Sequence, residues 1–350
     1  MSNITAKDIA LKLGISTASV SVALNGKPGV SQTTRARILA AAEEMGYSLP
    51  KNHEEENKTI CFLIYMDDTV GIVQESSFST FVLKGVEMAA KELGYQVLVR
   101  HFVPTMSFET QTADLLENIS GMLILGTDLT TRRRDAIAPL LGDWDVPFPV
   151  VIIDSFIFAS YVDCVGNDNL YGTKGAISYL IDHGHRKFGY LRSKQRISNF
   201  EDRENGIRMA IHDHLGQRAE PLKVIPVDIS AERAYQDILS WLQTKPELPD
   251  AFFAENDVVA AAALRAFHDC SIQVPQQVSL FGFDDIPICE MTVPTITTVH
   301  SFKERLGIEA VTRLHARITA GQTVRDAQKM GNVKIAMSTP VVERQSVRAK

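Results

Sequence analysis

The sequence has few cysteines, and none of them stands in a metal-binding or disulfide pattern. No CxxC pair occurs, and no histidine lies at the spacing of a metal ligand. We therefore expect free, buried thiols in a reducing compartment, with no metal ion and no other cofactor. The four cysteines are Cys61, Cys164, Cys270 and Cys289.

Long apolar runs are also missing. No run approaches the ~20 residues that a membrane-spanning helix requires. The first residues do not combine a charged segment with an apolar one, as a secretory signal would. These absences predict a cytoplasmic protein that has no membrane partner.

Common catalytic motifs are absent as well. The sequence contains no GxSxG, no GxGxxG after its first expected strand, no P-loop and no HExxH. His183 and His185 lie at the end of an expected helix, where a glycine-containing turn explains them. We expect a protein that is not an enzyme.

The charge is unevenly distributed along the 350 residues. The formal net charge is -6, which is unusual for a nucleic-acid binder. Residues 1–52, however, carry six basic and three acidic residues, so the net charge is +3 there and -9 in the rest of the chain. The positive charge is thus concentrated in a small N-terminal segment, where it could attract phosphates.

That segment has the pattern of two short helices joined by a tight turn. Thr5 is placed to cap the first helix, Gly14 to end it and Ser16 to cap the second, which Asn25 and Gly26 end. In the second helix Val20 and Leu24 are expected on the buried face, with Thr17, Ala18, Ser21 and Val22 turned outward. This layout is typical of a helix-turn-helix.

A third helix is expected after Ser31, with Ile38, Leu39, Ala42 and Met45 as its apolar positions and Gly46 after its end. The alternative is a helical domain without DNA-binding function. The short helices, the tight glycine turn and the serine-rich second helix favour DNA binding. The candidate DNA-binding residues are Thr5, Ser16, Thr17, Ala18, Ser19, Ser21, Val22, Asn25, Ser31 and Thr34.

The stretch from Ser48 to Lys58 contains a proline and a run of charged residues but no apolar period. We interpret it as a linker. The predicted domains are therefore 1–48, a helix-turn-helix domain, 49–58, an acidic linker, and 59–350, a body.

In the body, short β-rich runs alternate with helical patterns, which predicts parallel βαβ units. The number of units exceeds one ordinary sheet, so we expect two α/β subdomains of about six strands each with a cleft between them. The expected strands are 60–65, 96–101, 121–125, 149–153, 188–191, 223–227, 251–254 and 279–283, and the expected helices are 81–93, 110–118, 170–183, 201–213, 231–242 and 258–268.

Polar residues follow several of these strands. In open parallel sheets this position faces a ligand crevice. Carboxylates and amides there would suit a small ligand with many hydroxyls, although each residue could instead simply cap the next helix. The groups are Asp67-Asp68, Asp154-Ser155, Glu255-Asn256-Asp257 and Asp284-Asp285.

With these motifs in place, the chain resembles the LacI family of bacterial transcription regulators over nearly its whole length. In the N-terminal segment the resemblance rests on Asp8-Ile9-Ala10, Gly14-Ile15-Ser16, Val20-Ser21, Leu24-Asn25-Gly26 and Val30-Ser31. In the body it rests on Asn167-Asp168-Asn169, Asp182-His183-Gly184-His185-Arg186, Arg203, Gly206, Asn256-Asp257, Gly282-Phe283-Asp284-Asp285 and Pro294-Thr295-Ile296-Thr297-Thr298.

The resemblance implies a periplasmic-binding-protein-like body that binds an effector and forms a homodimer on a pseudo-palindromic DNA operator. The effector would be a sugar, a nucleoside or a related metabolite, and a sugar or sugar derivative is expected. The implied effector-binding residues are Phe78, Ser79, Asp154, Arg203, Asn256 and Asp284. It also implies that residues 59–166 with 298–326 form one subdomain and residues 167–297 with 327–350 the other.

The chain departs from the family pattern at three places. Val22 replaces an arginine that often reads guanine, so we expect apolar contacts with thymine methyls. Glu54, Glu55 and Glu56 replace a helix that wedges a leucine into the minor groove, so we expect a solvated linker and little operator bending. The stretch 228–230 lacks the usual aromatic residue that stacks on a sugar.

The function predicted from the sequence is a ligand-responsive transcription regulator, most simply a repressor. A solute-binding protein of a transport system would share the body but would need a signal peptide and no DNA-binding head. An enzyme would need one of the catalytic motifs.

Overall fold

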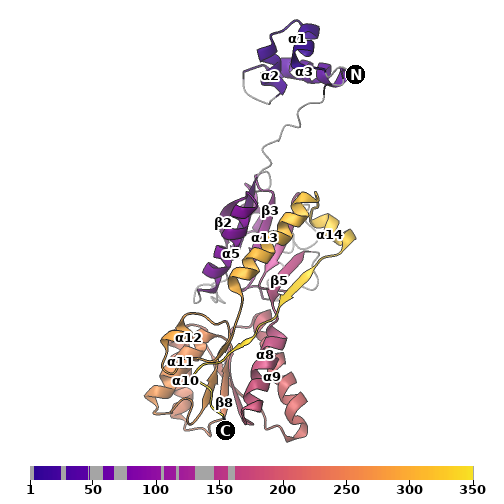
Figure 1. Ribbon diagram of the computed structural model, residues 1–350. Helices are drawn as coiled ribbons and strands as arrows, with labels where there is room; N and C mark the ends of the chain where they lie inside the picture. Colours follow the sequence, from indigo (N-terminus) through magenta and orange to yellow (C-terminus); the bar gives the residue numbers. More distant parts are fainter. Residues whose placement is uncertain are drawn as a thin grey trace. The chain divides into compact units, whose positions relative to one another are not determined.

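The computed structural model describes residues 4–24, 29–45, 47, 58–66, 77–103, 106–115, 118–130, 146–156 and 162–349. The chain forms two compact units, Met1–Lys58 and Thr59–Lys350 (Figure 1). Apart from Lys58, the expected linker and its three glutamates lie outside the described residues.

The first unit contains three helices, α1 (Ala6–Leu13), α2 (Thr17–Leu24) and α3 (Gln32–Glu44). A capping box starts α1, because the Asp8 carboxylate accepts hydrogen bonds from both the backbone N–H and the hydroxyl of Thr5, at 2.7 Å each. Gly14 ends α1 in the left-handed conformation (φ 66°), as expected of a helix C-cap glycine.

The three helices close one small core. Ile9, Val20 and Ile38 are fully buried in it, one from each helix. Two expectations for this unit need correction. Leu39 is exposed, and Ala41 takes its place in the core, because the buried stripe of α3 runs through positions 38, 41 and 42. Val22 is half-buried rather than fully outward.

The second unit consists of two lobes. Lobe 1 has a parallel six-stranded sheet of order β11-β5-β4-β3-β1-β2. One face is covered by α5 (Phe78–Glu92) and α13 (Lys303–Thr319), which lie side by side although they are far apart in sequence (Figure 1). The strands are β1 (Thr59–Tyr65), β2 (Gln96–Phe102), β3 (Gly121–Leu125), β4 (Val150–Ile153), β5 (Asp163–Asn167) and β11 (Lys334–Met337), and the short helices α6 (Phe108–Thr112) and α14 (Val324–Met330) complete the lobe.

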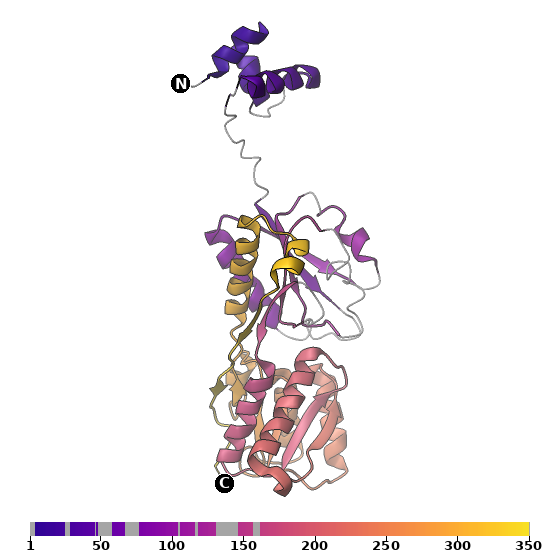
Figure 2. The same ribbon diagram turned by 90° about the vertical axis from the view of Figure 1, so that its right-hand side faces the viewer.

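Lobe 2 has a parallel four-stranded sheet of order β7-β6-β8-β9 with helices on both faces (Figure 2). One face packs on α8 (Asn169–Asp182) and α9 (Ser198–Leu215), and the other on α10 (Ala231–Gln243) and α11 (Asp257–Asp269). The strands are β6 (Phe188–Ser193), β7 (Lys223–Val227), β8 (Ala251–Ala254) and β9 (Ser279–Phe281), and the lobe also holds the 3₁₀ turn η3 (Gly216–Arg218) and α12 (Ile288–Met291).

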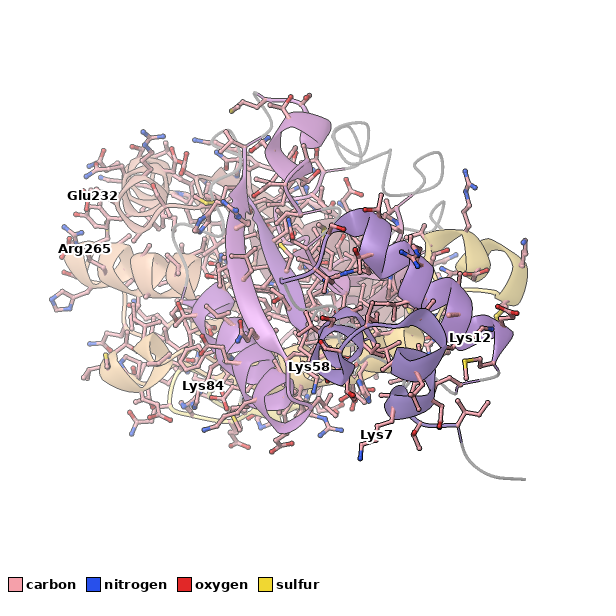
Figure 3. The ribbon with its side chains drawn as sticks, turned by 90° about the horizontal axis from the view of Figure 1, so that it is seen from above. Lys7, Lys12, Lys58, Lys84, Glu232 and Arg265 are labelled. Carbon is pink, nitrogen blue, oxygen red and sulfur yellow. The ribbon has the colours of Figure 1, made fainter. Side chains whose placement is uncertain are left out.

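On its outer edge, α10 and α11 are joined by an exposed ion pair between Glu232 and Arg265, at 3.0 Å (Figure 3). Exposed pairs of this kind contribute little to stability. The stability of lobe 2 therefore comes from the apolar clusters on the two faces of its sheet.

The chain crosses between the lobes three times, as the expected division implies, but the position of the last crossing corrects that division. It leaves lobe 1 between β5 and α8, returns between β10 (Thr298–Val299) and α13, and leaves again between β11 and β12 (Val341–Val342). Residues 327–337 therefore belong to lobe 1, because β11 pairs with β5. The strand β10 instead pairs with β12 beside lobe 2.

The expected strand number was right for lobe 1 and too high for lobe 2, whose sheet has four strands beside the two-stranded β10-β12 sheet. The helix expected at 110–118 is only α6, which ends at Thr112. The sequence interpretation missed β5, β10 to β12 and all three helices after residue 283.

Two glycines bring α5 and α13 into close contact. A Cβ atom on Gly85 would lie 1.9 Å from the carbonyl oxygen of Glu304, and one on Gly307 would lie 2.3 Å from that of Val82. Only residues without a side chain permit this approach, which fixes the two helices against each other. None of the described helices is long and apolar enough to cross a membrane.

Candidate ligand-binding cavity and nucleic-acid interface

A cavity lies between the two lobes, and side chains from both line it. All six residues expected to bind an effector are among them. Lobe 1 contributes from α5 and the ends of β3 and β4, and lobe 2 from α9 and the ends of β8 and β9. The lining residues are Phe78, Ser79, Thr127, Asp154, Ile197, Asn199, Phe200, Arg203, Asn256 and Asp284.

Two carboxylates face each other across the cavity from opposite lobes. Asp154 follows β4 and Asp284 follows β9, and both are buried. Each has a left-handed backbone, with φ 61° for Asp154 and φ 107° for Asp284. Non-glycine residues adopt this conformation at an energetic cost, and such residues concentrate at functional sites.

Asp154 accepts a hydrogen bond from the Thr127 hydroxyl at 2.7 Å and a long one from the Asn167 amide at 3.5 Å. Its backbone carbonyl accepts from the Asn199 amide of lobe 2 at 2.9 Å. The Asp154 segment thus connects the two lobes directly.

Arg203 is the buried cation of the cavity. Its Nε donates to Asn169 at 2.8 Å, one terminal nitrogen donates to the carbonyl oxygen of Glu255, and the other donates to Asp284 at 3.1 Å. The guanidinium also stacks on the Phe283 ring, 3.6 Å from its centroid. Protein groups therefore hold three of its five N–H donors and neutralise its charge.

Burial alters the protonation of these acids. It raises the pKa of Asp154 to about 7, and the nearby Asp284 adds to the effect while the Thr127 hydrogen bond opposes it. Burial likewise raises the pKa of Asp284, although Arg203 and Lys303 counteract the shift. The cavity therefore holds two acids with raised pKa values, and the nearby cations Arg203 and Lys303 offset the effect of burial only in part.

The cavity is small, about 20 Å³, which is roughly the space of one water molecule. A sugar-sized ligand could enter only if the lobes separated or the lining side chains moved. Among the described residues, several hydrogen bonds join the lobes, including a long one between the hydroxyls of Ser155 and Ser198 at 3.4 Å. Besides the Asn199 bond, the Lys303 ammonium at the start of α13 donates to the carbonyl oxygens of Asp284 and Asp285 in lobe 2.

Four lining residues were missed from the sequence, although signals for most of them exist. Asn199 and Phe200 precede Arg203 by four and three residues on α9, so they share its helix face. Thr127 comes shortly after β3, at the strand end where polar residues were sought for other strands. Ile197 packs with Phe200 and Ile229 in a small apolar cluster, and no sequence signal marked it.

Other polar residues at strand ends point away from the cavity. Glu255 accepts from Tyr190, from Arg196 and from the backbone of Ser193, and Asp257 accepts from Thr298 at 2.6 Å and from the backbone of Ile286 at 3.0 Å. These two acids join elements of lobe 2. Asp67 and Asp68 lie outside the described residues.

A larger cavity of about 510 Å³ has Asp285, His300 and Arg344 in its lining, together with the start of α13. Its charged groups have protein partners, either within the lining or on neighbouring residues such as Lys84 and Glu309. Asp285 bonds His300 at 2.6 Å and Arg344 at 2.8 Å, and although burial alone would raise its pKa, these bonds hold the pKa below the usual value. This cavity therefore offers a ligand mainly apolar surface, and the interlobe cavity is the better candidate for recognition of a polar ligand.

In the first unit, the outer surface of α2 is the candidate nucleic-acid interface. Thr17, Ala18 and Ser21 are exposed on it. Lys7 and Lys12 project from α1 in the same unit (Figure 3), and Lys12 pairs with Glu44 at 2.8 Å. Small side chains on an exposed helix allow the backbone to approach a DNA groove closely.

The serines expected to position phosphates also cap helices. Ser16 accepts from the backbone N–H of Ser19 at 3.0 Å, and Ser31 accepts from that of Thr34 at 3.1 Å. Their hydroxyls form further bonds to the side chains of Ser19 and Thr34, at 2.8 Å each. Capping thus explains part of this serine pattern. Asn25 lies outside the described residues.

A three-helix head joined to a two-lobed α/β body with a polar interlobe cavity is the architecture of ligand-responsive DNA-binding regulators. Comparison with known proteins agrees. Residues 5–49 match the family model for bacterial regulatory proteins of the lacI family, and residues 177–347 match the model for a periplasmic binding protein-like domain. The chain belongs to the LacI family of transcription regulators, which are not enzymes.

Curated relatives match the full length. The chain is 29% identical to the transcriptional repressor CytR of Escherichia coli (strain K12), over 99% of this chain and 96% of the relative. It is 26% identical to the repressor PurR of Pasteurella multocida, over 99% of each chain. The relatives are transcriptional repressors.

Solved structures share the fold. A complex of the transcriptional regulator CelR with cellobiose has a TM-score of 0.68 at 24% identity and covers 98% of this chain and 100% of that one. The Lac repressor dimer bound to operator and the anti-inducer ONPF has a TM-score of 0.68 at 20% identity, with 99% and 100% coverage. The predicted fold class, a helix-turn-helix head with a periplasmic-binding-protein-like body, is confirmed.

Proposed function

We propose that this regulator is a sequence-specific repressor whose affinity for its operator is controlled by a small molecule in the interlobe cavity. One observation carries the proposal. Six residues drawn from five separate stretches of sequence line one cavity, and they come from both lobes. A ligand that contacts both lobes binds one relative orientation of the lobes more tightly than another. It therefore shifts the body toward the orientation that it prefers.

The effector is proposed to be a sugar or a sugar derivative. The CelR complex with cellobiose supports this class, as does a LacI family regulator from Enterococcus faecium with bound ribose. The acceptors in the cavity, Asp154 and Asp284, suit the hydroxyls of such a ligand.

We also propose a cytoplasmic homodimer that places two heads on a pseudo-palindromic operator. The Lac repressor structure is a dimer on its operator, which supports this assembly. In lobe 2, Met291 and Val293 are 78% and 92% exposed, and two such apolar side chains next to each other suit an interface between copies.

On the DNA, Thr17, Ala18 and Val22 are proposed to contact bases, and Thr5, Ser16, Ser19, Ser21, Asn25, Ser31 and Thr34 to contact phosphates. A gel-shift assay with genomic fragments tests the DNA part. Ser21→Ala should weaken binding to all fragments equally, whereas Val22→Ala should change which fragments are preferred. A change of preference in Ser21→Ala at unchanged total affinity would reverse these roles.

The effector part is tested with Arg203→Ala. This variant leaves Asp284 without its cationic partner and should abolish the effect of ligand on operator binding. Its affinity for the operator without ligand should stay within a few-fold of the parent protein, because the head is unchanged. A normal ligand response in Arg203→Ala would contradict the assignment of the cavity.

A further inference from the structure

We infer that the effector is an uncharged or cationic molecule with hydrogen-bonding groups such as hydroxyls, and that phosphorylated or carboxylated compounds are rejected. This inference rests on the proposed effector function and specifies the chemical class of the ligand. It follows from the balance of charges and of donors and acceptors around the interlobe cavity.

The described part of the cavity lining carries little positive charge. Among the residues that the structure describes, its ionisable groups are two carboxyls, Asp154 and Asp284, and one guanidinium, Arg203. Arg203 is paired with Asp284 at 3.1 Å. With this ion pair formed, the charge of the described lining is zero or negative, and an anionic ligand would meet no unpaired cation among these groups.

The neighbouring cations of the described residues donate to protein groups. The buried Lys303 ammonium donates to the backbone carbonyls of Asp284, Asp285 and Ser301. Arg196 bonds the carboxylate of Glu255. An anion that took over either cation would leave buried carbonyl oxygens or the Glu255 carboxylate without their donor, at an energetic cost.

The lining also presents hydrogen-bond donors and acceptors. The carboxylates of Asp154 and Asp284 only accept when ionised, and the amide nitrogen of Asn199 is spent on the Asp154 carbonyl, so its remaining group toward a ligand is an acceptor. Asn256 uses its oxygen to cap α11, by accepting from Val259 at 2.9 Å, so its NH2 group remains as a donor, and two N–H groups of Arg203 remain as well. The lining therefore offers both acceptors and donors, which suit the hydroxyls of an uncharged ligand.

One feature argues the other way. The N-terminal ends of α5, α9 and α11 all contribute to the cavity, and helix N-termini attract anions. Asp154 and Asp284 line the same cavity, so an anionic ligand would also meet these two acids.

The test uses the full-length protein and a deproteinised small-molecule extract of the bacterium that encodes it. Anion exchange separates the extract into an unretained fraction, with neutral and cationic compounds, and a retained fraction of anions. The shift of the melting temperature Tm is measured with each fraction, before and after alkaline phosphatase treatment. We expect the Tm increase with the unretained fraction, and we expect phosphatase not to remove it.

Once the active compound is purified, its phosphate ester should need at least ~100-fold higher concentration for the same shift, because it brings an unpaired charge into the cavity. A shift produced by the retained fraction and removed by phosphatase would overturn the inference while leaving the effector function intact. A shift with neither fraction would count against the proposed effector function itself, and the inference would fall with it.

Variants connect the result to the cavity. Asp284→Asn releases the charge of Arg203 and should lower the response to the unretained fraction relative to the retained one. Glu201→Gln is the matched control, because it removes a negative charge from an exposed position on the same helix as Arg203. An unchanged ratio of the two responses in Asp284→Asn would contradict the inference.

Discussion

At the scale of single residues, the acids of this protein fall into two groups with opposite effects on stability. Asp163 is buried between Arg313 and Arg317, at 2.6 Å and 2.8 Å, and although burial opposes it, these arginines lower its pKa. Asp154 is buried with hydroxyl and amide partners, and its pKa rises to about 7. Asp163 therefore stabilises the fold as a carboxylate, and Asp154 does so as a neutral acid.

Asp154→Asn should therefore change the pH dependence of stability. Between the unfolded pKa of 3.8 and the folded pKa of about 7, the folded protein binds the extra proton, so Asp154 costs increasing stability as pH rises through this window. The asparagine does not titrate. The free energy of unfolding of the variant, relative to the parent, should rise between pH 4 and pH 8 by at most about 4 kcal/mol, at about 1.4 kcal/mol per pKa unit.

Urea titrations of both proteins at several pH values measure this difference. Asp163→Asn serves as the contrasting variant, because it should lose stability relative to the parent at pH 8 and lose less below pH 4. Parallel pH profiles of Asp154→Asn and the parent protein would show that Asp154 titrates normally.

At the scale of elements, local signals predicted most of the secondary structure up to residue 283. Alternation of β-rich runs and helical patterns identified β3 and β7 at their observed bounds, and Gly14 marked the end of α1. Asp154 and Asp284 were predicted because each directly follows an expected strand, and the ends of parallel strands face a crevice. Only the position of the strands along the sequence is needed for this prediction.

The rest depended on tertiary contacts. β11 is a strand because it pairs with β5, although its side chains are mostly half-buried and give no buried run. Leu39 is an apolar residue of the kind found in cores but lies on the face of α3 that points away from the core shared with α1 and α2. Ile197 is in the cavity because the segment before α9 packs on Ile229, which no local pattern reveals.

Gly85→Ala tests the packing of α5 on α13. Its new methyl group would lie 1.9 Å from the backbone oxygen of Glu304, which cannot move away as a side chain would, so we expect a loss of about 1–3 kcal/mol in the free energy of unfolding. Gly175→Ala on α8 is the control, because nothing lies within 4 Å of its new methyl group. It should be neutral or stabilising by up to about 1 kcal/mol. Equal effects of the two changes would contradict the close approach.

At the scale of the whole molecule, the proposed regulator needs two copies and two arrangements of its lobes. The cavity holds only about 20 Å³, and hydrogen bonds such as that from Asn199 to the Asp154 carbonyl can break and re-form, which fits a body that opens to admit its ligand. The effector then acts through the free-energy difference between the open and the closed body.

Val293→Asp tests the assembly. The exposed valine is replaced by a charge that would be buried between copies, so sedimentation should show monomers, and operator affinity should fall at least ~10-fold because one head alone contacts one half-site. Lys84→Ala is the control, because it removes an exposed ion pair with Glu304 on the other lobe. It should leave the fold, the dimer and the operator affinity unchanged. A dimeric Val293→Asp protein would exclude this surface as the interface.

The close contact of α5 and α13 at Gly85 and Gly307 also has a mechanical consequence. Both helices begin near the interlobe side, at Phe78 and Lys303, and they are locked together as a single rod. The 17 residues of α13 span about 25 Å at 1.5 Å per residue. A rotation of roughly 10° about the crossing segments would move the far end of this rod by about 4 Å, so the pair acts as a lever arm that amplifies a small change in the cavity.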